Sequence, residues 1–179
     1  LNAEINLDHS IRYPNLDSEY TNTITFNEYN KWLGNVSEYR LYRSVNRQPF
    51  SLIPLYTWDR VNNPNEPLEF IDVVTSYGKG NGRFCYYVQA LEGFANPYGP
   101  TLVGSNSNIT CISQTPVVFI PNSFTPNGDE HNEIFRPLTF FVSEEGYSFT
   151  IYNRHGTLVF ETNDPQKGWD GTFLGENAP

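Results

Sequence analysis

Clusters of Gly, Pro, Asn and Asp interrupt this chain at short intervals, and they constrain its fold more than any other feature. Examples are NNPNEP at residues 62–67, YGKGNG at 77–82 and PNGD at 126–129. Such clusters favour turns, and the segments between them do not show the spacing of a long helix. With 12 Tyr and 13 Phe among 179 residues, these segments are rich in residues that favour strands. The sequence therefore predicts an all-β fold of short strands.

The predicted strands fall into two groups. The first group is 22–26, 37–44, 50–56, 68–74, 83–91 and 108–112, and the second is 117–120, 147–153 and 157–161. In residues 83–91, RFCYYVQAL, alternation places Phe84, Tyr86, Val88 and Ala90 on the better core face. Pro116 would interrupt a sheet ladder between the groups. We expect two β-sandwich-like domains, residues 1–113 and 114–179, the second small and truncated.

Charge argues against nucleic-acid binding, and hydropathy argues against a membrane-spanning helix. The formal net charge is −9, from 11 Lys and Arg against 20 Asp and Glu, with no basic cluster, so nucleic acid is not an expected partner. No apolar run approaches the roughly 18 residues of a membrane-spanning helix. Because the chain starts at Leu1 rather than Met, we expect a fragment or processed product of a longer protein.

The segment ITFNEYNKWLGNVSEYRLYRS, followed by CYYVQALE, resembles the fibronectin type III fold over most of residues 20–113. The resemblance implies an Ig-like β-sandwich that serves as a spacer or interaction module. It implies a core that includes Tyr39, Leu41, Tyr86, Val88 and Ala90. It also places Cys85 and Cys111 on neighbouring antiparallel strands, where a disulfide and two unpaired thiols are both open alternatives.

The segments VFIPNSFTPNGDEHNEIFRP and FTIYNRHGTLVFETNDPQKGWDGTF resemble the gliding motility-associated C-terminal domain over residues 117–179. Domains of this family lie at the C-terminal end of many surface proteins of Bacteroidota and are recognised by the type IX secretion system. The resemblance implies an exported, non-enzymatic region that binds outer-membrane secretion components, including barrel-type partners. The family usually has Gly at the position of Glu130, Asp at Glu133 and an aromatic residue at His155, and it continues into strands that lie beyond Pro179.

Three motifs of the resemblance supply the candidate partner-binding residues. Most of these residues are expected to shape loops and core, and Arg154 is the candidate for a direct, salt-sensitive contact. The candidates are Phe124, Pro126, Asn127, Gly128 and Asp129 of the first loop, Asn153, Arg154 and Gly156 of a hairpin turn, and Trp169, Asp170 and Gly171.

The first loop, NSFTPNGDEHNEIF at 122–135, allows two interpretations. One is a calcium site, because Ca²⁺ takes oxygen ligands such as those of Asn127, Asp129, Asn132 and Glu133. His131 is a poor ligand for hard cations, and the spacing to a closing carboxylate is too short for an EF-hand. No cofactor is otherwise expected.

The second interpretation is a structural turn, which the sequence favours. Gly128 is free to adopt positive φ, and short Asn and Asp side chains can accept hydrogen bonds from nearby backbone amides. Phe124, Ile134 and Phe135 would then pack inward.

No motif predicts a catalytic site. The three His residues lack metal-ligand spacing, and the chain has no G-x-S-x-G elbow, P-loop or G-x-G-x-x-G. Two rival functions stay open. The first is a carbohydrate-binding or adhesion module, in which Trp58 and Tyr56 form a sugar-stacking platform rather than packing under loop 62–67. The second is an appendage of an upstream secreted enzyme.

Overall fold

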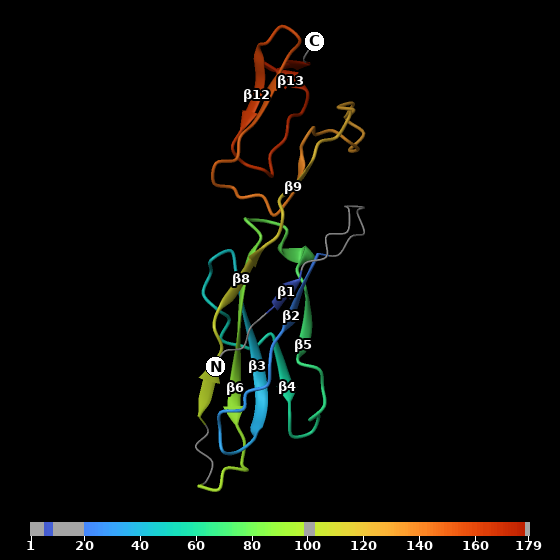
Figure 1. Ribbon diagram of the computed structural model, residues 1–179. Coiled ribbons are helices and arrows are strands. Elements are labelled where there is room, and N and C mark those ends of the chain that lie inside the picture. The colour runs from blue at the N-terminus through green and yellow to red at the C-terminus, as the bar shows by residue number, and fades with distance from the viewer. Residues whose placement is uncertain (1–5, 9–19, 99–102, 178–179) are drawn as a thin grey trace. The chain divides into compact units, whose positions relative to one another are not determined.

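The computed structural model describes residues 6–8, 20–98 and 103–177 (Figure 1). In this part of the chain all regular structure is strand except one 3-10 turn, η1 (Thr75–Tyr77), so the all-β prediction is confirmed. Contacts divide the chain into two compact units. The first unit is Leu1–Ser76 with Arg83–Gln114, and the second is Tyr77–Gly82 with Thr115–Pro179.

The first unit contains two antiparallel sheets. One sheet has the strand order β1-β2-β5, from β1 (Asn6–Asp8), β2 (Thr21–Thr25) and β5 (Glu69–Val73). The other has the order β4-β3-β6-β7, with β8 also paired to β6. Its strands are β3 (Val36–Val45), β4 (Tyr56–Asp59), β6 (Arg83–Glu92), β7 (Gly104–Asn106) and β8 (Thr110–Ser113). Such a pair of sheets is the framework of a β-sandwich.

The core of the first unit is drawn from alternate positions of these strands. In β6 the four residues of the predicted core face, Phe84, Tyr86, Val88 and Ala90, are completely buried, as alternation requires. Tyr39 and Leu41 of β3 are buried too, so these core predictions are confirmed. Aromatic rings fill the rest, with Phe26 in edge contact with both Tyr39 and Trp58 at centroid distances of 5.1 and 4.9 Å.

A buried polar network joins the two sheets of the first unit. Arg43 of β3 donates to both carboxylate oxygens of Asp72 in β5 at 2.6 and 2.8 Å, and the Tyr86 hydroxyl donates to Asp72 at 2.7 Å. Asn22 donates to the Tyr86 oxygen and accepts from Gln114, at 2.7 and 2.6 Å. Burial, together with the Asp72 charge, raises the pKa of Tyr86. The chain of partners satisfies groups that would otherwise be costly to bury.

Opposite residues of β6 and β8 form a covalent link in the first unit. Cys85 and Cys111 are directly paired in the strand register, with Cα atoms 4.0 Å apart, and their sulfurs form a disulfide. Among the described residues no cysteine is free. The disulfide therefore fixes β8, the last strand of this unit, to β6.

The second unit is built from two-stranded sheets, which agrees with a small, truncated β-sandwich. The pairs are β9 (Val117–Phe119) with β10 (Leu138–Phe140), β11 (Phe149–Tyr152) with β12 (Leu158–Thr162), and β13 (Thr172–Phe173) with β14 (Glu176–Asn177). Phe141 is fully buried against Gly82, where an added Cβ would lie 2.7 Å from the Phe141 Cβ. Many apolar side chains of this unit stay exposed, among them Phe119, Ile120 and Tyr152.

Two local predictions are wrong. Residues 50–55 form no strand, and only Tyr56 of the predicted segment lies in one. The Ser51 hydroxyl accepts the Ile53 amide at 3.1 Å, and Pro54 lacks an amide donor, so the chain bends between Ser51 and Leu55. Only the Ser51 and Leu55 amides donate to β3 carbonyls here. Ile134, expected to pack inward, is 50% exposed, whereas the ring of the neighbouring Phe135 contacts Phe124 and Phe149.

Candidate partner-binding site

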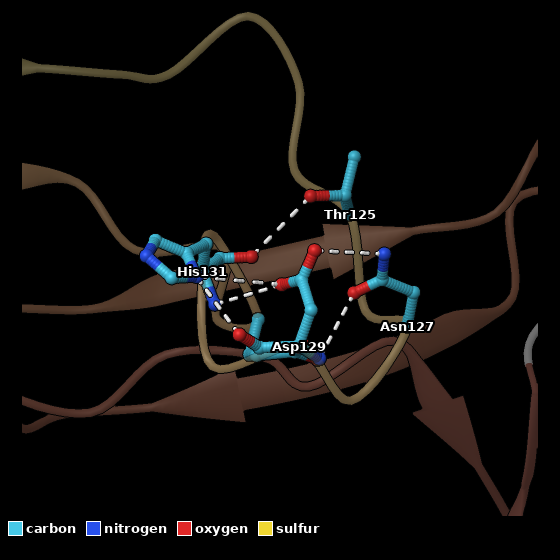
Figure 2. A network of polar contacts seen from close by, with 5 residues as sticks. Thr125, Asn127, Asp129 and His131 are labelled. Carbon is cyan, nitrogen blue, oxygen red and sulfur yellow. Dashed lines mark hydrogen bonds and ion pairs between the residues drawn. The ribbon is translucent and has the colours of Figure 1, made fainter.

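The first loop of the second unit is ordered by its own side chains. Asn127 donates to one carboxylate oxygen of Asp129 at 3.0 Å and accepts the Asp129 amide at 3.2 Å (Figure 2). The other Asp129 oxygen accepts the His131 amide at 2.9 Å, and Thr125 Oγ1 donates to the His131 carbonyl at 3.4 Å. These bonds, led by that from Asn127, hold the pKa of Asp129 below its ordinary value.

Left-handed backbone alternates along the same loop. Gly128, Glu130 and Asn132 have φ values of 81°, 67° and 54°. Gly accepts this conformation at no steric cost and Asn at little, whereas a longer side chain such as Glu is disfavoured there. The sequence predicts positive φ at Gly128 but carries no signal for Glu130 other than the resemblance, since the family usually has Gly at that position.

The four candidate calcium ligands lie close together in the sequence, but several of their side-chain oxygens already accept hydrogen bonds within the loop. Asp129 accepts from Asn127 and His131, and Glu133 Oε1 accepts the Asp129 amide at 2.8 Å. In the parts of the chain that the structure describes, no group of three His, Cys, Asp or Glu is placed to hold a metal ion. The hydrogen bonds account for the loop as a structural turn, and calcium binding stays a prediction.

A second motif packs against the base of this loop. Phe135 and Trp169 form an isolated antiparallel bridge, and Phe124 lies 5.5 Å from each of their rings. Gly171, at φ 85°, approaches so closely that an added Cβ would lie 2.9 Å from Pro126 Cγ. The structure therefore brings Phe124, Pro126, Trp169 and Gly171 together.

Asp170 closes the turn after Trp169. Its carboxylate accepts the backbone amide and the hydroxyl of Thr172 at 2.9 and 2.8 Å, and these two bonds lower the pKa of Asp170. The Trp169 indole N–H donates to the Thr172 carbonyl at 2.7 Å. The residues of this motif thus build a turn of fixed shape rather than a reactive site.

The hairpin between β11 and β12 stands apart from these two motifs. Asn153 Oδ1 accepts the amides of His155 and Thr157 at 2.9 and 3.0 Å, and Gly156 has φ 81°. Arg154 is exposed, and its Nε lies 3.3 Å from His155 Nε2. Within the described residues no hydrogen bond or ring contact joins this hairpin to the first loop, so the predicted residues form two separate surfaces.

Of the two alternatives for Trp58, the structure supports packing under loop 62–67 and not an exposed sugar-stacking platform. Trp58 is fully buried in the first unit, and its indole N–H donates to the Pro67 carbonyl at 2.9 Å. Tyr56, its neighbour in the proposed platform, is 37% exposed and contacts Trp58 at a centroid distance of 4.8 Å. Trp58 therefore packs under loop 62–67, because its ring fills the space between that loop and the core.

The geometry of the second unit defines an all-β module of ordered turns and short sheets. Residues 118–179 match the CHU_C family, the type IX secretion signal domain. This match confirms the predicted resemblance to the C-terminal domain that the type IX secretion system recognises in the proteins it exports. No significant match was found among curated proteins or among solved structures.

Membership of this family identifies the second unit as a secretion signal. A type IX secretion signal domain is a non-catalytic region that directs export through interaction with the secretion machinery. No helix in the described residues has the length and apolar character to cross a membrane.

Proposed function

We propose that the second unit exports its protein through the type IX secretion system and then attaches it to the cell surface, as in gliding-motility adhesins. The observation that carries the proposal is the match of residues 118–179 to the secretion signal family. The first unit acts as a spacer that holds the preceding part of the protein away from the outer membrane. Neither unit has a catalytic role in this proposal.

Strand addition is the binding mode that the sheets of the second unit support. Within the described residues β11 and β12 pair only with each other, so each has an edge with unpaired backbone groups. An extended partner segment can hydrogen-bond to such an edge while side chains supply specificity. Tyr152 and Leu158, which are 59% and 40% exposed, offer apolar contacts beside it. Barrel-type components of the outer membrane are the proposed partners.

Arg154 is the proposed point of direct electrostatic contact. Its guanidinium is exposed at the tip of the hairpin, in a chain whose net charge is −9. A contact between this cation and an acidic partner group would weaken as ionic strength rises, because salt screens exposed charges. Replacing Arg154 by Ala should weaken partner binding and reduce its salt dependence, whereas Arg154→Lys should keep most of both.

Deletions in the full-length protein test the two proposed roles, secretion signal for the second unit and spacer for the first. Removing everything from residue 115 onward should abolish surface display and leave the protein inside the cell. Removing residues 1–76 instead keeps every residue of the second unit, including 77–82, and should preserve export, because a spacer does not direct secretion. Unchanged surface display after the first deletion would refute the proposed role of the second unit.

A further inference from the structure

The first unit contains a polar cleft at the end of β4 that the secretion role does not use. It is a shallow depression of about 590 Å³ that is open to solvent, so a ligand bound in it would keep part of its surface exposed. Strand β4 supplies one wall and the loop that follows it supplies the other. The lining residues that matter here are Tyr56, Asp59, Asn62, Asn63, Asn65 and Glu66.

The loop that forms the cleft is held in place before any ligand arrives. Asp59 Oδ1 accepts the amides of Val61 and Asn62, both at 3.0 Å. Arg60 donates to the Glu66 carbonyl at 2.9 Å, and the Trp58 indole donates to the Pro67 carbonyl at 2.9 Å. A site whose walls are already ordered loses little conformational entropy when a ligand binds.

An aromatic ring forms part of the cleft wall and is firmly supported. The Tyr56 ring contacts Trp58 and Phe70 at centroid distances of 4.8 and 5.0 Å, and 37% of the residue stays exposed. Its hydroxyl donates to Glu66 Oε1 at 2.6 Å. The ring therefore offers a fixed apolar surface beside the polar groups of the loop.

Two carboxamides of the cleft have unused hydrogen-bonding capacity. Asn63 and Asn65 are exposed, and their side chains make no hydrogen bond to any described residue. Each carboxamide offers two donor hydrogens and an acceptor oxygen. The Asp59 carboxylate, by contrast, is already engaged by the loop, since Oδ1 accepts the Val61 and Asn62 amides and Oδ2 accepts the Asn62 side chain.

This set of groups defines the chemical class of the ligand. Carboxamides and carboxylates pair with neighbouring hydroxyl groups, and an aromatic face packs against C–H groups. The cleft is lined by two carboxylates and by no Lys or Arg, which disfavours phosphorylated, sulfated or acidic ligands. Arg60, the nearest cation along the chain, has its guanidinium engaged by Glu28 at 2.7 Å and by the Glu66 carbonyl.

We propose that this cleft binds a neutral saccharide of one or two sugar units. Tyr56 packs against the sugar ring, Asn63 and Asn65 bind its hydroxyls, and Glu66 accepts from them through the carboxylate oxygen that Tyr56 does not use. The site is independent of the secretion role of the second unit, since every residue in it belongs to the first unit.

Nuclear magnetic resonance titration of the intact 179-residue chain tests this proposal. The probes are the methyl glycosides of glucose, galactose, mannose, xylose and N-acetylglucosamine, with methyl glucuronide as the acidic comparison. At least one neutral glycoside should shift the amides of residues 56–66 in a saturable manner, and the glucuronide should bind at least tenfold more weakly. The double variant Asn63→Ala/Asn65→Ala should weaken binding about tenfold or more, as expected for lost hydrogen bonds.

Matched controls make the result specific. Asn163→Ala removes an exposed carboxamide from the second unit and should leave binding unchanged. Tyr56→Phe keeps the ring and should retain more affinity than Tyr56→Ala. The proposal is overturned if no neutral glycoside shifts these amides, if the double Asn variant binds as well as the native chain, or if calcium chloride alone saturates the cleft and blocks the sugars.

Discussion

Phe135 and Trp169 exchange two backbone hydrogen bonds, with N···O distances of 2.7 Å from the Phe135 amide and 2.9 Å from the Trp169 amide. The pair joins the end of the first loop to the K-G-W-D-G motif, although the two segments are far apart in the sequence. Phe124 packs on both rings, so the bridge also holds the start of the loop. The shape of the first loop therefore depends on a non-local contact.

Gly168→Ala should open this bridge. An added Cβ would lie 2.5 Å from Ile134 Cγ2 and 2.8 Å from the Phe135 carbonyl oxygen, so the two segments must separate. Forced overpacking costs about 1–3 kcal/mol, which corresponds to roughly 5- to 150-fold faster hydrogen exchange at the Phe135 and Trp169 amides. The adjacent exposed substitution Lys167→Ala is the control and should leave both rates unchanged. Equal rates in the Gly168 variant and the native chain would contradict the tight packing.

Glu130→Gly should stabilise the second unit. Glu130 has φ 67°, where an L side chain costs about 1 kcal/mol and Gly costs almost nothing, so the net gain should be up to about 1 kcal/mol. Calorimetric unfolding of the intact chain measures the change. Glu144→Gly, at a residue without positive φ, should be neutral or destabilising because Gly adds entropy to the unfolded chain. Loss of stability in both variants would argue against strain at Glu130.

The Asp129 carboxylate should titrate below its ordinary pKa, which is about 3.9 in unfolded chains. Because the folded pKa is lowered, the ionised side chain stabilises the loop fully above the unfolded value, and this contribution is lost as the pH falls through the folded pKa. Carboxyl chemical shifts measured against pH test this. Asn127→Ala should raise the Asp129 pKa, whereas Asp170, held by Thr172, should not change. Ordinary titration of Asp129 in the native chain would refute the hydrogen-bonded loop.

Removing the Cys85–Cys111 disulfide should destabilise the first unit by about 2–4 kcal/mol, because a cross-link across a separation of 26 residues restricts the unfolded chain. Denaturant unfolding of the Cys85→Ala/Cys111→Ala variant measures this loss. A reducing agent should lower the stability of the native chain by a similar amount and leave the variant unaffected. If the reducing agent had no effect on the native chain, the bond would contribute nothing.

The fold prediction for the first unit rested on the alternation of apolar and polar residues along single strands. The core face of β6 could be predicted because one side of it is completely buried. The absence of a strand at 50–55 could not be predicted, because its apolar residues satisfy strand preferences while Ser51 and Pro54 make the chain bend. Leu52, at 97% exposure, shows that apolar character alone does not place a residue in a strand.

The candidate site was predictable only where its chemistry is local. Hydrogen bonds between Asn127, Asp129 and nearby amides follow from turn preferences of short polar side chains. The bridge between Phe135 and Trp169, and the burial of Trp58 under loop 62–67, depend on tertiary contacts that no local pattern encodes. The buried network around Asp72 was missed for the same reason, since its members come from separate strands and from Gln114.

An export assay tests the central claim most directly. A fluorescent cargo is fused to residues 77–179, which contain the whole second unit, together with any residues that follow them in the full-length protein. The fusion is expressed in a Bacteroidota host with and without a working type IX system. The account predicts cargo on the cell surface only in the host with the working system, and less of it when the fusion carries Gly168→Ala. Cargo retained in the periplasm of both hosts would contradict the account.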